Sequence, residues 1–143
     1  MQRQLILMRH GHAEEGRDDY VRRLTEVGRK AARRAGQALA RAGFSPERLL
    51  TSPAPRAHET AELVAEACEF AGPLEAERAL YLAEEPAYLA ALRSLPEQVS
   101  RVLLIGHNPA LSALARKLGP PGTELRPAEY VDLRLELDGW RDL

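Results

Sequence analysis

Cysteine is almost absent from this chain of 143 residues, because Cys68 is the only one. No disulfide can therefore form within the chain, which is typical of proteins from a reducing compartment. The amino terminus shows no signal-peptide pattern, and the apolar run that follows it is too short to cross a bilayer. We therefore expect a cytoplasmic protein that does not contact a membrane.

An excess of charge of either sign is also missing. The 20 basic residues nearly balance the 21 acidic ones, which gives a formal net charge of -1. Domains that bind nucleic acid usually carry a marked basic excess, so we expect no nucleic-acid partner. Neither a repeat nor a linker divides the sequence, so we expect one domain over residues 1–143. A monomer is compatible with this sequence, which does not determine the oligomeric state.

Apolar runs that end at polar residues predict three buried strands. They cover Leu5–Met8, Arg48–Ser52 and Arg101–Ile105. A fourth strand, Tyr130–Asp138, alternates apolar and charged residues, which is typical of a half-exposed strand at a sheet edge.

Helices are predicted between these strands. They run from Thr25 as cap to near Gly43, from Ala57 to Glu69, from Pro86 to Leu95, and from Pro109 to just before Gly119. Asn108 stands where it can cap the last of them, with Pro109 as the first helical residue. The alternation predicts a three-layer α/β/α domain with a mostly parallel central sheet and one antiparallel edge strand.

The segment Leu5–Glu14 reads LILMRHGHAE, so an apolar strand runs directly into Arg9, His10 and Gly11. Reactive groups collect at the carboxyl ends of strands in open α/β sheets, because the loops there converge on one crevice. A neutral imidazole is a good nucleophile, and its ordinary pKa of about 6.5 keeps that form available near neutral pH. A guanidinium offers a planar set of donors for phosphoryl oxygens, so Arg9 and His10 predict phosphate chemistry.

Three more cationic or imidazole side chains follow strands elsewhere in the chain. Arg22 lies in the first loop, Arg56 follows the second strand, and His107 follows Arg101–Ile105. Each alone is typical of an ordinary surface residue, but strand ends of such a sheet share one rim. We therefore expect the arginines and His107 to surround a phosphoryl group and leave its phosphorus open to in-line attack by His10.

Four ordered motifs resemble the histidine phosphatase superfamily. They are Arg9-His10-Gly11, Leu24-Thr25-x-x-Gly28, Ser52-Pro53-x-x-Arg56-Ala57-x-x-Thr60-Ala61 and Gly106-His107-Asn108-Pro109. The short length and the last motif are similar to the small SixA-type phosphohistidine phosphatases. The resemblance covers about Leu5 to Leu118 and implies a fold like that of phosphoglycerate mutase.

The resemblance also implies roles for individual residues. His10 would be the nucleophile that becomes phosphorylated, and Arg9, Arg56 and His107 would line the phosphate pocket. Arg22 would bind substrate as well, and the adjoining Gly11 and Asn108 are expected beside it. Members of this family need no metal or other cofactor, and the substrate would be a phosphorylated protein or a small phosphorylated compound.

A proton donor is not evident. Larger relatives place a glutamate after the third strand, where this chain has Ala79-Leu80-Tyr81, so Glu84, Glu85 and Asp19 are the candidates. A good leaving group, such as the imidazole of a phosphohistidine, needs less help from an acid than an alkyl alcohol does. This favours phosphoramidates or acidic alcohols as substrates.

More than one function is compatible with these residues. His10-x-His12, with His107 and a loop carboxylate, could form a metal site, although alternate residues of an extended strand point to opposite faces. A mutase would need insertions that enclose a sugar phosphate, and the chain is short for that. A phosphatase of small metabolites, or a module that binds phosphoryl groups without turnover, would also fit the same motifs.

Overall fold

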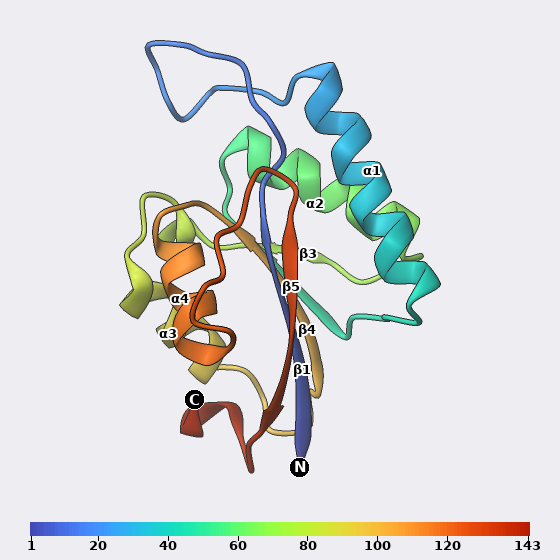
Figure 1. The fold of residues 1–143 in the computed structure, drawn as a ribbon, viewed down its shortest axis with the longest axis vertical. Coiled ribbons are helices and arrows are strands. Elements are labelled where there is room, and N and C mark those ends of the chain that lie inside the picture. Colours follow the sequence, from blue (N-terminus) through green and yellow to red (C-terminus); the bar gives the residue numbers. More distant parts are fainter.

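The computed structural model describes residues 1–143 and is built around a five-stranded sheet with the order β3-β2-β4-β1-β5 (Figure 1). The strands are β1 (Gln2–Arg9), β2 (Arg48–Thr51), β3 (Leu74–Ala76), β4 (Arg101–Gly106) and β5 (Tyr130–Glu136). Neighbouring strands are parallel except for β1 and β5, which pair antiparallel at one edge. The predicted mostly parallel sheet with one antiparallel edge strand is confirmed.

Helices cover both faces of this sheet (Figure 1). On one face lie α1 (Glu26–Arg41) and α2 (Pro55–Ala67), and on the other lie α3 (Glu85–Arg93) and α4 (Ala110–Leu118). Two short 3-10 helices, Arg78–Leu80 and Trp140–Asp142, complete the regular structure. The fold is therefore a single three-layer α/β/α domain, and none of its helices has the length and apolar character needed to cross a membrane.

The central strands β1 and β4 carry the apolar runs Leu5–Met8 and Val102–Ile105 because both of their faces are buried there. Along β1, Leu5 and Leu7 belong to the core under α3 and α4, whereas Ile6 and Met8 belong to the core under α1 and α2. These four side chains have no exposed surface, and burial of each one stabilises the fold by about 1.5–3 kcal/mol.

Two sequence predictions need correction. The strand β3 was not predicted, because three residues that are only partly buried or exposed carry no apolar pattern. The helix α4 begins at Ala110, one residue later than predicted, so Pro109 is its cap residue and not its first helical residue. Asn108 still serves the helix start, because its side-chain oxygen accepts the backbone N–H of Ser112 at 3.1 Å.

Arg3 is fully buried at the amino-terminal end of β1, which its sequence position did not indicate. Its guanidinium donates to the backbone oxygens of Glu97, Val99, Leu137 and Asp138 and lies over the ring of Trp140. Arg3 thus fastens the segment after β5 to the end of the sheet that lies opposite the site described next.

Candidate active site

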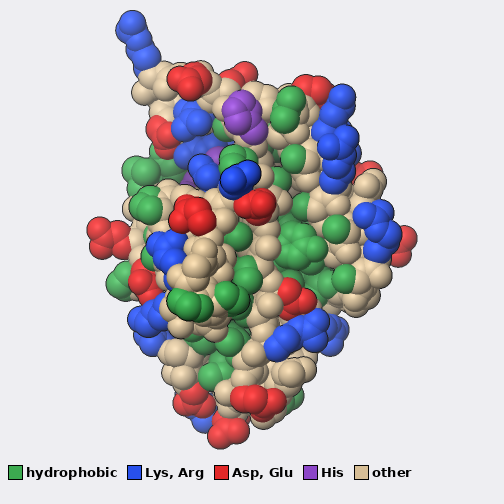
Figure 2. Space-filling view, in the orientation of Figure 1, with side chains coloured by type: hydrophobic (Ala, Val, Ile, Leu, Met, Phe, Trp, Pro, Cys, Tyr) green, Lys and Arg blue, Asp and Glu red, His purple; other side chains and the backbone are tan.

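The carboxyl ends of β1 and β4 bring two histidines together. Arg9 and Gly106 are register partners on these parallel neighbours, so His10 and His107 follow at the same level. Their ring centroids are 5.1 Å apart. They open on a cavity of about 370 Å³ lined by Arg9, His10, Asp19, Arg22, Arg56, Leu82, Ala83, His107, Asn108 and Pro109. Basic and histidine side chains gather at that end of the molecule in Figure 2.

The imidazole of His10 is held in one tautomer. Its Nδ1 lies 2.7 Å from the carbonyl oxygen of Gly11, and a carbonyl can only accept, so the hydrogen must sit on Nδ1. Burial lowers the pKa of His10 to about 4, and the nearby guanidinium of Arg56 contributes in the same direction. At neutral pH, His10 is therefore uncharged and keeps a free lone pair on Nε2.

Two glycines let the first turn of α1 press against the loop that carries His10. A Cβ added to Gly28 would lie 2.1 Å from the backbone oxygen of His12, and one added to Gly11 would lie 2.8 Å from the oxygen of Gly28. No side chain fits either position. Thr25 caps α1 by accepting the backbone N–H of Gly28 at 3.0 Å. The Leu24-Thr25-x-x-Gly28 motif thus supports the nucleophile loop from behind.

Thr60 joins the His10 loop to α2. Its buried hydroxyl accepts the backbone N–H of Gly11 at 3.1 Å and donates to the backbone oxygen of Arg56 at 2.7 Å. This fixes Arg56, on the first turn of α2, relative to His10. The backbone N–H of Gly11 is consumed in this contact, so it supports the loop and is not free to bind a phosphoryl oxygen.

His107 is held from two sides. Its backbone N–H donates to the hydroxyl of Tyr88 at 3.0 Å, and its Nε2 lies 2.7 Å from the hydroxyl oxygen of Ser52. Burial lowers the pKa of His107 to about 3, with a further contribution from His10. His107 is therefore neutral at ordinary pH.

Three buried nitrogen atoms around the cavity have no hydrogen-bond partner within the protein. They are Nε of Arg9, Nε of Arg56 and Nδ1 of His107, and the side chain of Glu85 holds the only other such atom in the chain. Buried polar groups are almost always paired, so an unpaired group needs an explanation. The two guanidinium nitrogens are donors, and an anion in the cavity that accepts from them explains why they lack partners within the protein.

The carboxylate of Asp19 sits against the arginines of the cavity. It accepts from Arg22 at 2.9 Å, from Arg56 at 3.0 Å and from the hydroxyl of Tyr81 at 2.8 Å. The Tyr81 hydrogen bond, followed by those of the two guanidinium groups, lowers the pKa of Asp19 to about 2. Asp19 is therefore ionised at neutral pH, where it positions guanidinium groups and has no proton to donate.

The loop that carries Asp19 and Arg22 is closed at its base. Ala13 and Leu24 form an antiparallel bridge, and the backbone N–H of Glu14 donates to the oxygen of Arg23 at 2.9 Å. The backbone N–H of Thr25 donates to the oxygen of His12 at 3.0 Å in the same region. These contacts attach the base of the loop to the His10 loop, and Asp19 attaches its far part to Arg56 and Tyr81.

The remaining candidate proton donors lie outside the cavity. Glu84 is exposed just before α3, and Glu85 pairs with Lys117 at 3.3 Å. The side chain of Asn108 borders the cavity, but its amide donates to the backbone oxygen of Leu125 and its oxygen accepts from Ser112. Asn108 therefore holds the start of α4 and the Leu125 segment together.

His12 does not join the other two histidines. Its Nδ1 lies 2.9 Å from the hydroxyl of Thr25, and the side chain is exposed outside the cavity. No three His, Cys, Asp or Glu side chains are grouped so that they could hold a metal ion. His58 pairs with Glu62 on the surface of α2.

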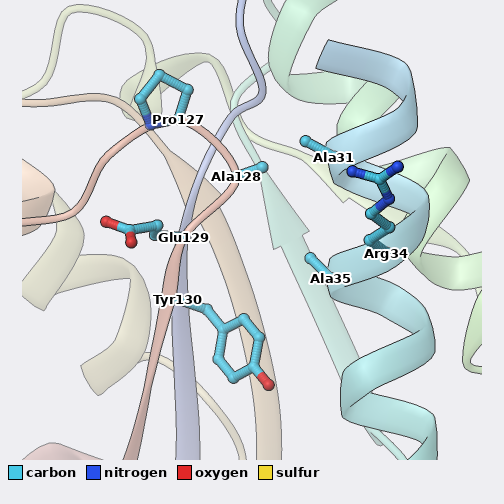
Figure 3. A pocket seen from close by; sticks show the side chains of 7 residues that line it. All are labelled: Ala31, Arg34, Ala35, Pro127, Ala128, Glu129 and Tyr130. Atoms are coloured by element: carbon cyan, nitrogen blue, oxygen red, sulfur yellow. The ribbon is translucent and has the colours of Figure 1, made fainter. Parts of the chain in front are cut away.

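A second hollow of about 420 Å³ separates α1 from the segment before β5 (Figure 3). Ala31, Arg34 and Ala35 line it from α1, opposite Pro127–Tyr130. The backbone N–H of Ala128 donates to the oxygens of both Arg9 and His10 at 3.1 Å. This segment therefore braces the end of β1, and the hollow contains none of the unpaired donors.

Sequence reasoning assigned no role to Ser52, Thr60, Tyr81 or Tyr88. Ser52 and Thr60 belong to the motif around Arg56, so the motif itself was the available signal. Tyr81 and Tyr88 contact the site through side chains that are distant in sequence, and no local pattern marks them.

The family model described as histidine phosphatase superfamily (branch 1) matches residues 5–81, more than half of the chain. The chain belongs to the histidine phosphatase superfamily. It is similar to the solved structure of the protein histidine phosphatase SixA with tungstate, at 30% identity over 90% of this chain and 86% of that one, with a TM-score of 0.82. A Nakamurella multipartitia protein described as a SixA phosphohistidine phosphatase is 26% identical over 99% of this chain and 89% of that one, with a TM-score of 0.84.

This histidine phosphatase also matches a curated relative in part. Mitochondrial serine/threonine-protein phosphatase Pgam5 of Drosophila ananassae is 40% identical over 63 residues. That match spans 43% of this chain and 22% of the relative's length. Phosphoglycerate mutase from Bacillus anthracis, 17% identical over 96% of this chain and 89% of that one with a TM-score of 0.68, shares the fold. The comparisons are consistent with a phosphatase, and so with a hydrolase, and show a SixA-like structure.

Proposed function

We propose that this phosphatase removes the phosphoryl group from phosphohistidine in a protein or peptide, through a covalent intermediate on Nε2 of His10. The observation that carries the proposal is the pair of unpaired buried Nε donors of Arg9 and Arg56, grouped with the unpaired Nδ1 of His107 around a neutral imidazole. The donors would bind the oxygens of a phosphoryl group, and His10 would attack its phosphorus.

The first half-reaction follows from the tautomer of His10. Nε2 attacks the phosphorus with its lone pair while Nδ1–H stays bonded to the oxygen of Gly11, which stabilises the positive charge that develops on the ring. Arg9, Arg56 and Arg22 bring positive charge to the phosphoryl oxygens. No reorganisation of these groups is required, because Thr60 and Asp19 already hold Arg56 in place.

Because the site has no proton donor, it suits a substrate whose leaving group needs no proton from the enzyme. Asp19 is ionised, and Glu84 and Glu85 lie outside the cavity. An imidazole that carries a proton on its other ring nitrogen leaves as a neutral group and needs no acid from the enzyme. An alkyl alcohol would leave as a strongly basic alkoxide, so phosphohistidine suits this site better than phosphoserine.

The second half-reaction is hydrolysis of the intermediate. Water forms a new bond to phosphorus as the bond from phosphorus to Nε2 of His10 breaks. The electron pair of the broken bond returns to Nε2, and both protons of the water leave on dihydrogen phosphate. His10 is then neutral again, and each step uses only side chains of this chain.

Rapid-quench labelling tests the proposal. A peptide phosphorylated on histidine is mixed with the protein, and the protein is assayed for phosphate that is acid-labile and base-stable. We expect a transient label in the wild type and in His58→Ala, a control histidine on the surface of α2, and none in His10→Ala. Equal turnover by His10→Ala, or turnover without any label, would contradict the covalent route. Faster turnover of a matched phosphoserine peptide would contradict the proposed substrate.

A further inference from the structure

Ser52 and His107 meet across two neighbouring strand ends. Ser52 follows β2 and His107 follows β4, and these strands are parallel register partners up to Thr51 and Ile105. The hydroxyl oxygen of Ser52 lies 2.7 Å from Nε2 of His107. Ser52 has no exposed surface, so water does not compete for this contact.

The hydrogen-bond partners of Ser52 determine where its own hydrogen points. The hydroxyl oxygen accepts the backbone N–H of Ala54 at 3.2 Å, which uses one lone pair. Nε2 of His107 is the acceptor that remains for the hydroxyl hydrogen. A hydroxyl that donates to Nε2 requires that this nitrogen carry no hydrogen.

The other nitrogen of the ring then carries it. His107 is neutral because burial lowers its pKa to about 3, so one ring nitrogen is protonated and the other is not. With Nε2 accepting from Ser52, the hydrogen lies on Nδ1. That is the atom of His107 that is buried and unpaired.

We propose that Ser52 is a positioning residue that fixes neutral His107 in its Nδ1–H tautomer, which presents a hydrogen-bond donor to a phosphoryl oxygen. The inference rests on the proposed function for the identity of that oxygen, but the tautomer belongs to the free protein. Without the Ser52 hydroxyl, the Nε2–H tautomer becomes accessible, and a lone pair on Nδ1 would repel the phosphoryl oxygen. The site thus gains a donor without having to charge a histidine beside three arginines.

Nitrogen-15 NMR of imidazole-labelled protein tests the inference directly, in the absence of substrate at pH 7. Couplings to the ring carbon-bound hydrogens distinguish Nδ1–H, Nε2–H and imidazolium forms. We expect His107 as Nδ1–H in the wild type and a shift toward Nε2–H in Ser52→Ala. An Nε2–H or imidazolium His107 in the wild type, or an unchanged tautomer in Ser52→Ala, would overturn the inference.

Kinetics supply the second readout. We expect Ser52→Ala to lose about a hundredfold in kcat, with a smaller change in KM, as for removal of one donor to a developing oxyanion. Thr51→Val is the matched control, because Thr51 is an equally buried neighbouring hydroxyl that bonds the backbone oxygen of Ser52 and not His107. Equal losses in both variants would assign the effect to packing and overturn the inference.

The outcomes separate this inference from the proposed function. If His10→Ala keeps full turnover while wild-type His107 is Nδ1–H, the proposed function fails and the role of Ser52 in fixing the tautomer stands. If His10→Ala is inactive while wild-type His107 is Nε2–H, the role of His10 in the proposed function stands and the role of Ser52 in fixing the tautomer fails. Should Ser52→Ala fail to fold because the backbone N–H of Ala54 loses its acceptor, the wild-type spectrum alone still decides.

Discussion

Replacement of Arg56 by lysine tests how the cavity uses a guanidinium in addition to its charge. The side chain of Arg56 is 5% exposed, and its three nitrogens are divided between two tasks. Nη1 and Nη2 donate to the backbone oxygen and carboxylate of Asp19 at 2.7 and 3.0 Å, whereas Nε has no partner in the protein. Lysine keeps the charge, but its donors all sit on one terminal nitrogen, so it cannot place one donor at the position of Nε and others at the positions of Nη1 and Nη2.

The magnitude follows from the loss of one buried donor to the transition state. Such a loss costs about 2.7–4 kcal/mol, or 10²–10³ in kcat. We expect Arg56→Lys to show this reduction in kcat for p-nitrophenyl phosphate, whereas Arg29→Lys serves as the control. Arg29 bonds Glu59 and Glu26 on the surface outside the cavity, and exposed pairs of this kind contribute about 0–1 kcal/mol to stability.

Two measurements make the result interpretable. Urea denaturation of Arg56→Lys shows whether the variant is folded at the assay temperature. Carbon-13 NMR of the carboxyl groups should show a higher pKa for Asp19, because the hydrogen bond from Nη2 of Arg56 to this carboxylate is lost or weakened. A folded Arg56→Lys enzyme with wild-type kcat would refute the assignment of Nε as a phosphoryl donor.

Four further predictions concern the support and charge of the site. Thr60→Val leaves the backbone N–H of Gly11 buried without an acceptor, so the free energy of unfolding in urea should fall by about 1–3 kcal/mol. Gly28→Ala places a Cβ 2.1 Å from the oxygen of His12 and should cost about 1–3 kcal/mol in the same assay, although alanine is the better helix former. His10 should titrate near pH 4 by NMR in the folded protein, against 6.5 for the ordinary side chain. The unfolded chain then binds more protons between these values, so folding stability should fall as pH drops from 6.5 toward 4. Turnover should persist in excess chelator.

Each of these outcomes has a contrary result. Gly122→Ala is the control for the helix variant, because a Cβ there meets nothing within 4 Å. Equal stability of the two alanine variants would show that the contact with the His10 loop is unimportant. Titration of His10 above pH 6 would mean that burial does not keep it neutral, and loss of activity in chelator that zinc restores would indicate a metal site.

Much of the fold could be predicted because local signals and burial agree. The apolar run Arg101–Ile105 is a central strand buried on both faces, and the alternation in Tyr130–Asp138 marks the edge strand β5. Thr25 caps α1 as its position indicated. The strand β3 escaped prediction because its pairing with β2, and not its own side chains, defines it.

The candidate site likewise contains residues that could be predicted from the sequence and contacts that could not. Residues directly after strands, such as His10 and His107, could be placed because parallel strand ends share one rim. The contacts that set the protonation of His107 and Asp19 could not be predicted, because each joins residues that are far apart in the sequence. Ser52 is 55 residues from His107, and Tyr81 is 62 residues from Asp19. The sequence candidates Glu84 and Glu85 lie slightly after the position where larger relatives place a glutamate, and neither of them lines the cavity.

The closed base of the loop between Ala13 and Leu24 separates two kinds of change that evolution can make. Substitutions or insertions between these two residues change the surface that a substrate meets, while the imidazole of His10 stays aligned. Asp19 and Arg22 are the exceptions, because Asp19 holds Arg56 and Arg22 lines the cavity. A stretch grafted from a relative could therefore redirect specificity as long as it keeps these two residues.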